Sequence, residues 1–296
     1  MLFNTQVVTE TITYKTVDGR NLTSDIYLPL EKKFEKSPVL YYFPGGGWSA
    51  CGKGEPRQLL YSMQTLREQG VTIISSEYRV TTDGKTTFYE LIEDCADAMR
   101  YFLHNADKYG IDPKCAGIAG TSAGGHISLV LGTYGNRFGS IYLDDTEIAP
   151  DFIIDVCGPT FMYEKGLVQY LDLFPDEDPN NNTITRLMGG TEEEVPQNYK
   201  DASPLYHVET CRKPPLTIVH GDHDQTVPLA QSYIYQNEYK RFGGECELTI
   251  VWGGRHNLSP DTSAGFTDVQ PGLLDLDIKF TETFLENVNK VLEARK

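Results

Sequence analysis

The chain contains no run of about 18 apolar residues, so no segment is expected to cross a bilayer as a helix. Residues 1–10 lack both a basic stretch and an apolar stretch, so no secretion signal is expected and a cytoplasmic location is predicted. Positive charge is also scarce, because 26 Lys and Arg stand against 42 Asp and Glu and give a net charge of −16. This excess of negative charge argues against nucleic acid and anionic membranes as partners, since both would be repelled.

Closely spaced cysteine pairs are lacking too, because none of the six cysteines stands in a C-x-x-C pair. In a chain of 296 residues we expect buried thiols rather than a disulfide framework. The remaining composition is ordinary for a soluble globular protein, with 40% hydrophobic and 23% charged residues. This length and composition allow a substantial core, and we predict a single domain over residues 1–296.

Apolar and alternating segments predict strands and helices that follow one another along the chain. The first two strands flank Asp18-Gly19 and are expected to form an antiparallel hairpin. The later alternation predicts an α/β fold, with a doubly wound, mostly parallel sheet and helices on both faces. The expected strands cover residues 7–14, 22–28, 38–43, 71–76, 115–119, 151–156, 216–220 and 247–252. The expected helices cover residues 55–69, 89–109, 123–134, 229–242 and 273–294.

Residues 161–209 do not fit this alternation, because they are polar, irregular and rich in aromatic side chains. An acidic run at residues 176–178 lies in their middle and is expected to be solvated. We predict that this segment is an inserted cap or lid over the C-terminal edge of the sheet. A ligand bound at that edge would be partly enclosed by it.

The sequence Gly120-Thr121-Ser122-Ala123-Gly124 lies between an apolar strand and a predicted helix. A Gly-x-Ser-x-Gly in that setting is typical of a nucleophile elbow, a turn so sharp that it lifts the serine hydroxyl above the sheet edge. Strand and helix pass so closely there that a Cβ at either glycine would collide. The pattern therefore predicts Ser122 as a nucleophile.

A serine hydroxyl needs a base that removes its proton, and the base needs an acid that orients it. In this kind of sheet both partners follow the serine along the chain, each just beyond the end of a strand. His256 and Asp224 meet these conditions, and we predict them as base and acid. Asp222 is the rival acid, but it lies closer to its strand end, where we expect it to brace the turn.

Residues 220–224 read His-Gly-Asp-His-Asp, so a metal site is an alternative interpretation of this loop. The spacing matches no helical ligand motif and no EF-hand loop. We therefore predict no metal and no cofactor. The loop is expected to serve the nucleophile through Asp224 instead.

The oxyanion that forms on an attacked carbonyl needs backbone amides aimed at it. One such amide belongs to the residue after the nucleophile, here Ala123, and others come from a glycine loop after an earlier strand. Glycines 45–47 stand directly after the strand expected over residues 38–43, and without Cβ atoms they let the backbone approach a substrate. We predict an oxyanion hole made by this loop and Ala123.

Four further side chains lie next to these motifs. Trp48 follows the glycine loop, where it forms either a substrate-binding wall or a packing contact under the loop, and both interpretations stay open. His126, one turn into the elbow helix, and Cys157, at a strand end, are expected to be structural. Arg79 is expected to pair with a nearby carboxylate behind the site.

Several of these motifs occur together in the order found in one group of enzymes. From about residue 20 to its C-terminus the chain resembles the α/β-hydrolase esterases, above all the hormone-sensitive-lipase-like carboxylesterases and the bacterial feruloyl and acetyl-xylan esterases. In one departure, Pro44 stands where the first of these families usually has a histidine before the glycines. The motifs that carry the resemblance are Phe43-Pro44-Gly45-Gly46-Gly47-Trp48, Glu77-Tyr78-Arg79, Ile111-Asp112-Pro113, Gly120-Thr121-Ser122-Ala123-Gly124-Gly125-His126, Asp201-Ala202-Ser203-Pro204 and the loops of Asp224 and His256.

The resemblance implies a catalytic triad of Ser122, Asp224 and His256. It also implies an oxyanion hole of three backbone amides, those of Gly46, Gly47 and Ala123. The activity it implies is a serine carboxylic-ester hydrolase that works through an acyl-enzyme. Its expected partner is a small-molecule or carbohydrate-linked ester, with short acyl chains or plant cell-wall acetyl and feruloyl groups favoured.

Two other functions remain as alternatives. A serine peptidase of the prolyl-oligopeptidase type has a similar sheet, but about forty residues precede the glycine loop and would not accommodate its large propeller. A non-catalytic binding protein built on a hydrolase fold is the second alternative. Such proteins generally lose a triad residue, whereas all three are present in this sequence.

Overall fold

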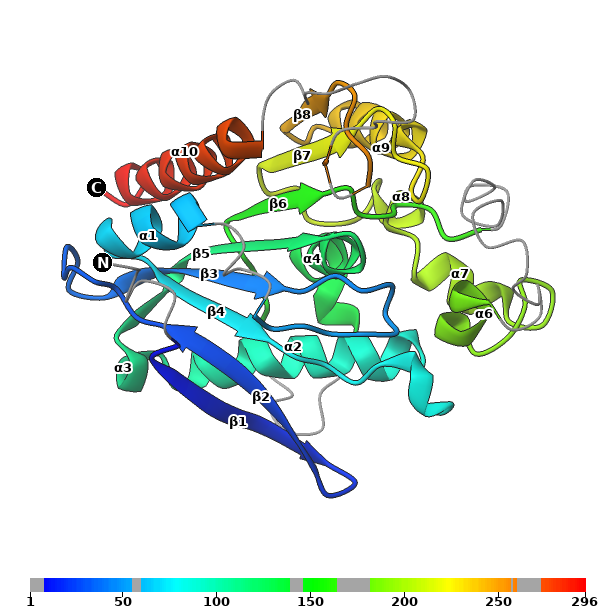
Figure 1. Ribbon diagram of the computed structural model, residues 1–296, viewed down its shortest axis with the longest axis horizontal. Helices are drawn as coiled ribbons and strands as arrows, with labels where there is room; N and C mark the ends of the chain where they lie inside the picture. The colour runs from blue at the N-terminus through cyan, green and yellow to red at the C-terminus, as the bar shows by residue number, and fades with distance from the viewer. Residues whose placement is uncertain (1–7, 55–59, 139–145, 164–181, 257, 260–272) are drawn as a thin grey trace.

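The computed structural model describes residues 8–54, 60–138, 146–163, 182–256, 258–259 and 273–296. Within these residues a sheet of eight strands runs through the molecule in the order β1-β2-β4-β3-β5-β6-β7-β8 (Figure 1). The strands are β1 (Glu10–Val17), β2 (Arg20–Tyr27), β3 (Ser37–Phe43), β4 (Thr72–Ser76), β5 (Ile111–Thr121), β6 (Phe152–Val156), β7 (Leu216–Gly221) and β8 (Cys246–Val251). The described helices are α1 (Leu60–Glu68), α2 (Phe88–His104), α3 (Ala106–Tyr109), α4 (Ala123–Tyr134), α6 (Thr183–Met188), α7 (Pro196–Asp201), α8 (Pro204–His207), α9 (Leu229–Arg241) and α10 (Leu273–Glu293), with 3-10 turns η3 (Thr81–Asp83) and η4 (Gly135–Arg137).

The antiparallel hairpin predicted at the start of the chain is confirmed. β1 and β2 pair antiparallel, with Val17 opposite Arg20. Both residues of the connecting turn have left-handed backbones, Asp18 with φ 50° and Gly19 with φ 78°. A two-residue turn of this kind matches the right-handed twist of the strands, and an Asp-Gly pair adopts it readily.

The mostly parallel sheet is also confirmed, because every neighbouring pair from β4 across to β8 is parallel. β3 is buried along its whole length, since helices cover both of its faces. Val39, Tyr41 and Phe43 pack in a cluster with residues of α2, α4 and α9. Leu40 and Tyr42 point the other way and pack with residues of α1 and α10. Figure 1 shows α1 and α10 side by side on that face.

The prediction of a single helix over residues 89–109 is wrong, because the structure has two helices there, α2 and α3. Asn105 separates them with φ −103° and ψ 21°, outside the helical region. Its side-chain amide donates to the carbonyl of Tyr101 at 2.7 Å. A short polar side chain that bonds to the backbone in this way competes with continuation of the helix. Gly110, with φ 62°, ends α3 as expected.

Two predictions fall partly outside the described residues. The helix expected from residue 55 is seen as α1, and residues 55–59 lie outside the described part of the chain. Of the cap expected over residues 161–209, residues 164–181 with their acidic run are likewise not described. The described remainder contains α6, α7 and α8, which Figure 1 shows beyond the arrowheads of the central strands. The role of this segment as a cap stays a prediction.

None of the six cysteines, all of which lie in the described part of the chain, forms a disulfide. Four of them are buried, and Cys51 and Cys211 are half-buried. Among the described helices, not one combines the length and the apolar character that a bilayer crossing requires.

Candidate active site

Ser122 stands at the turn between β5 and α4, with φ 56° and ψ −119°. Few residues other than glycine adopt this backbone conformation, so the turn stores strain of about 1–3 kcal/mol. The need for glycine on either side is confirmed by the packing. A Cβ on Gly120 would lie 2.4 Å from the carbonyl carbon of Gly124, and one on Gly124 would lie 1.9 Å from the carbonyl oxygen of Phe43. The close crossing of β3, β5 and α4 therefore fixes where the serine hydroxyl stands.

The structure brings the three predicted triad residues together in one hydrogen-bonded line. His256 Nε2 lies 2.7 Å from Ser122 Oγ, and His256 Nδ1 lies 2.7 Å from Asp224 Oδ2. Since a carboxylate only accepts hydrogen bonds, Nδ1 carries the ring proton and donates a hydrogen bond to Asp224. Nε2 then has a free lone pair directed at the serine hydroxyl. This arrangement has the geometry of a nucleophile, a base and an orienting acid.

The Asp224 carboxylate is buried, with 5% of the residue exposed. Burial raises its pKa, but hydrogen bonds from His220 and His256 outweigh that effect and lower the pKa to about 2. Its Oδ1 also accepts from the backbone amides of Thr226 at 2.8 Å and Val227 at 2.9 Å. Asp224 is therefore a fixed anion at neutral pH beside the imidazole.

Asp222, the rival acid, lies elsewhere. Its Oδ1 accepts from the backbone amide of Gly253 at 2.6 Å, which ties the loop after β7 to the loop after β8. This is the bracing contact that the sequence led us to expect. Of the two aspartates in the loop, Asp224 contacts His256.

His220 contacts the same carboxylate, a contact that the sequence analysis did not predict. Its Nε2 lies 3.1 Å from Asp224 Oδ2 and 2.9 Å from the carbonyl of Val227. Both atoms are acceptors, so Nε2 carries the proton, and Nδ1 accepts from the Ser232 hydroxyl at 2.7 Å. The spacing of a histidine four residues before the acid was visible in the sequence. The contact with α9 through Ser232 was not.

The glycine loop lies against the elbow. A Cβ on Gly45 would be 2.7 Å from the carbonyl oxygen of Thr121 and 3.5 Å from Ser122 Cβ. Gly46 has φ 119° and Gly47 has φ 57°. Within the described residues, no group accepts a hydrogen bond from the amides of Gly46, Gly47 or Ala123. These amides are therefore available to a bound oxyanion, although their assignment stays a prediction.

The loop has a brace at Pro44, the position that departs from the resemblance. The Tyr78 hydroxyl donates to the carbonyl of Pro44 at 2.6 Å, and both groups are buried. A proline carbonyl remains an acceptor although the residue has no amide hydrogen. Tyr78 therefore holds the start of the glycine loop directly.

Trp48 is 3% exposed, and its indole packs against His126 of α4. Nε1 donates to His126 Nδ1 at 3.2 Å, with the rings edge to face and their centroids 5.4 Å apart. His126 Nε2 therefore carries the proton and donates to the carbonyl of Ala202 at 2.7 Å. Burial lowers the pKa of His126 to about 4, so the ring is neutral. Of the two interpretations of Trp48, this geometry describes the packing contact.

Arg79 pairs with a carboxylate, as expected. Its Nε and Nη2 reach the two oxygens of Asp94 at 2.7 Å and 2.8 Å. Lys15, from β1, enters the same network and lies 2.9 Å from Asp94, 2.9 Å from Glu93 and 2.7 Å from Asp97. The Lys15 side chain is fully buried among these three acids. The network joins the hairpin to α2 and is structural.

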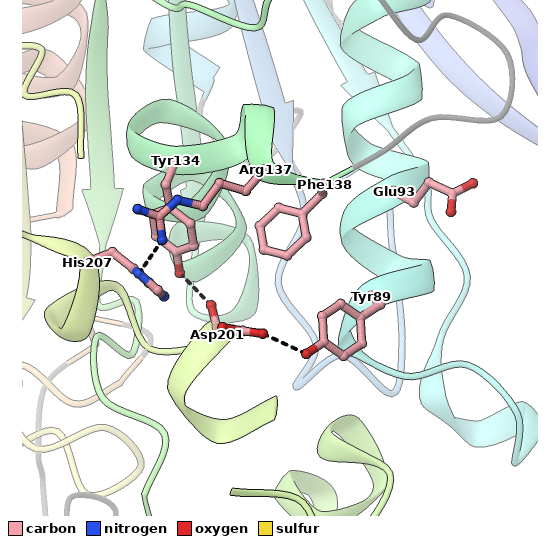
Figure 2. Close-up of a pocket in the computed structure, with 7 residues that line it drawn as sticks. All are labelled: Tyr89, Glu93, Tyr134, Arg137, Phe138, Asp201 and His207. Atoms are coloured by element: carbon pink, nitrogen blue, oxygen red, sulfur yellow. Dashed lines mark hydrogen bonds between the residues drawn. The ribbon is translucent and has the colours of Figure 1, made fainter. Parts of the chain in front are cut away.

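A separate hollow of about 400 Å³ lies at the other end of α4 (Figure 2). α4 has 12 residues, so its last residue, Tyr134, lies about 18 Å from Ser122 along the helix. No pattern in the sequence indicates this hollow, and it is distinct from the triad. Its lining residues are Tyr89, Glu93, Tyr134, Arg137, Phe138, Asp201 and His207.

Comparisons with known proteins find esterases and deacetylases among the relatives. Esterase LipC of Mycobacterium tuberculosis is 26% identical over 213 residues, covering 70% of this chain and 49% of that protein. Arylacetamide deacetylase of Oryctolagus cuniculus is 31% identical over 124 residues, covering 41% of this chain and 31% of that protein. The chain thus spans about half, or less, of the length of these curated relatives.

Solved structures give a similarity over nearly the whole length. The butyrate-bound esterase Est2 of Thermogutta terrifontis superposes with a TM-score of 0.74 at 22% identity, covering 96% of this chain and 95% of that one. A truncated carbohydrate esterase from gut microbiota superposes with a TM-score of 0.72 at 26% identity, covering 95% and 97%. The α/β-hydrolase fold and the resemblance to esterases are therefore confirmed.

The model of one protein family, described as BD-FAE, matches residues 24–239. This range includes the glycine loop, the elbow and Asp224, and His256 lies beyond its end. The match extends over most of the described sheet. The chain therefore belongs to the BD-FAE family and has the α/β-hydrolase fold.

Proposed function

We propose that this chain is a serine carboxylic-ester hydrolase with Ser122 as nucleophile, His256 as base and Asp224 as orienting acid. The observation that carries the proposal is the line of two 2.7 Å contacts from the serine hydroxyl through the imidazole to the carboxylate. The backbone strain at Ser122 and the depressed pKa of Asp224 support it, because both are typical of sites under functional constraint. The similarity to esterases supports the same reaction class.

In the first half of the reaction, Ser122 Oγ attacks the ester carbonyl carbon while its proton passes to His256 Nε2. The imidazolium that forms is stabilised by the Asp224 anion at Nδ1. The carbonyl oxygen becomes negative and accepts hydrogen bonds from the amides of Gly46, Gly47 and Ala123. Collapse of this intermediate expels the alcohol, which takes the proton from Nε2 and leaves an acyl-serine.

In the second half, water takes the place of the alcohol. His256 Nε2 removes a proton from the water, whose oxygen attacks the acyl carbon. The second tetrahedral intermediate uses the same amides. The proton then returns to Ser122 Oγ as the carboxylic acid leaves, so the enzyme ends as it began.

We further infer that the substrates are esters of short acyl groups or plant cell-wall esters that carry acetyl or feruloyl groups. Support comes from the butyrate and propionate bound in the Thermogutta esterase and from the carbohydrate esterase among the structural neighbours. The net charge of −16 favours neutral esters over strongly anionic ones.

The test compares wild type with Ser122→Ala on p-nitrophenyl acetate. We expect the variant to lose at least about 10³-fold in kcat, with unchanged circular dichroism. A fluorophosphonate probe should label wild type and leave Ser122→Ala unlabelled. Wild-type turnover by Ser122→Ala would refute the role of the serine. Hydrolysis of aminoacyl or prolyl peptides in preference to esters would show that the chain is a peptidase instead of an esterase. A panel of acetyl, butyryl, octanoyl and feruloyl esters defines which acyl group the enzyme prefers.

A further inference from the structure

The side chain of Cys157 lies close to Asp224 and His256, and all three side chains carry an atom that can bind a metal ion. The sulfur, one carboxylate oxygen and one ring nitrogen of the Cys157–Asp224–His256 cluster all lie within 4.8 Å of one another. The thiol donates to the backbone carbonyl of His256 at 3.1 Å. Cys157 directly follows β6, while Asp224 and His256 stand in the loops after β7 and β8. Three adjacent strands therefore deliver a sulfur, an oxygen and a nitrogen to one point.

We propose that this cluster is a binding site for a thiophilic divalent cation such as Zn²⁺, and that occupation of the site inhibits the enzyme. Zinc takes thiolate, imidazole and carboxylate ligands at about 2.0–2.3 Å, which places tetrahedral ligands about 3.2–3.8 Å apart. The cluster has to contract by about 1 Å to reach that geometry. Three protein ligands leave a fourth position for water.

The charges in the cluster fit a dication. A Cys157 thiolate and the Asp224 carboxylate together neutralise Zn²⁺, and the thiol proton passes to the solvent when the metal binds. The net charge of −16 also raises the local concentration of cations around the molecule.

Hydrogen bonds order two of the three ligands, Cys157 and Asp224, before any metal arrives. The amide of Cys157 donates to the carbonyl of Val219 at 2.9 Å and fixes the end of β6 to β7. Asp224 Oδ1 is held by the two backbone amides of the following turn. Cys157 has φ 47°, a left-handed backbone that turns the chain sharply after β6. Little ordering is therefore needed on binding.

Either mode of coordination to the ring prevents catalysis. Metal at Nδ1 shifts the ring proton to Nε2, which then points an N–H at Ser122 and accepts nothing. Metal at Nε2 occupies the lone pair that takes the serine proton. Magnesium and calcium prefer oxygen ligands, so they are not expected to bind here.

The first experiment measures the rate of ester hydrolysis at increasing ZnCl₂ concentration in a buffer that does not chelate metal. Because it measures inhibition of hydrolysis, this experiment rests on the proposed function. We expect Zn²⁺ and Cd²⁺ to inhibit wild type, EDTA to restore the rate, and Mg²⁺ to have no effect. Cys157→Ser and Cys157→Ala, each compared with its own metal-free rate, should need at least about tenfold more zinc for half-inhibition. Cys211→Ser, a half-buried thiol outside the cluster, is the matched control and should behave as wild type.

The second experiment does not depend on turnover. Co²⁺ is titrated into Ser122→Ala with and without Cys157→Ser, and the near-ultraviolet band from thiolate to cobalt is recorded. The band should form with Cys157 and vanish without it. Equal zinc sensitivity of wild type and both Cys157 variants, no inhibition of wild type, or cobalt binding without the band would each overturn the site. If the protein hydrolyses no ester, the proposed function fails while the cobalt titration still decides the metal site.

Discussion

Replacing Asp224 by asparagine tests the central contact of the site most directly. The carboxylate accepts four hydrogen bonds: two from the backbone amides of Thr226 and Val227, and two from the rings of His220 and His256. An asparagine in the same place must turn its NH₂ toward one of these pairs of donors. The backbone amides cannot adapt, whereas an imidazole can change tautomer.

We therefore expect the NH₂ of Asp224→Asn to face the histidines. His256 then accepts at Nδ1, carries its proton on Nε2 and presents an N–H to Ser122 in place of a lone pair. This wrong tautomer should lower kcat for p-nitrophenyl acetate by about 10⁴-fold, which corresponds to about 5 kcal/mol of barrier. KM should change little, because no substrate contact is removed.

The same substitution also alters the pH dependence of stability. The folded-state pKa of Asp224 lies near 2, below its usual 3.8, so the carboxylate stabilises the fold above pH 3.8. That contribution, about 2 kcal/mol, is lost as the pH falls from 3.8 toward 2. Urea unfolding of Asp224→Asn between pH 2 and 5 should lack this component.

The matched control is Asp222→Asn, in the same loop. An asparagine oxygen can still accept from Gly253, so kcat should stay within about tenfold of wild type. Equal losses in the two variants, or an Asp224→Asn enzyme that keeps more than a tenth of wild-type kcat, would refute the reasoning.

Three further predictions concern other contacts. His220→Gln should lower kcat about 10–100-fold with KM unchanged, because the Asp224 carboxylate loses the contact from the His220 ring that helps to position it. An unchanged kcat in steady-state assays would rule out this positioning role. Gly124→Ala should reduce the free energy of unfolding by about 3 kcal/mol, measured in urea, since its Cβ would meet the Phe43 carbonyl at 1.9 Å. Lys15→Met should cost about 3–5 kcal/mol in the same assay by leaving three acids without their buried cation, and a loss under 1 kcal/mol would contradict this.

Much of the site could be predicted because its residues follow strand ends. The carboxyl ends of parallel strands meet at one edge, so Ser122, Asp224 and His256 were expected there without any knowledge of strand order. The glycines at 120 and 124 were predictable for a related reason, since a strand-to-helix turn of that sharpness admits no Cβ.

Other features depend on contacts between distant segments. The position of β4 between β2 and β3 is set by crossover connections, which no local pattern specifies. The bond from His220 to Ser232 exists because α9 packs against β7, and the sequence spacing alone does not show it. The break at Asn105 was missed because the apolar periodicity continues through it, while the side chain binds the backbone locally.

The backbone of Ser122 has a consequence for the evolution of the chain. At φ 56° and ψ −119° every side chain is strained, but glycine is not. Ser122→Gly and Ser122→Ala both lose the hydroxyl, so the difference between their unfolding free energies reports the backbone strain at position 122. Relief of the strain stabilises the glycine variant by about 1–3 kcal/mol. The greater conformational freedom of glycine in the unfolded chain offsets about 0.5–1 kcal/mol of this gain. The glycine variant should be the more stable of the two. Selection for stability alone would therefore favour glycine at position 122 and give an inactive protein. Only selection for catalytic activity retains the serine.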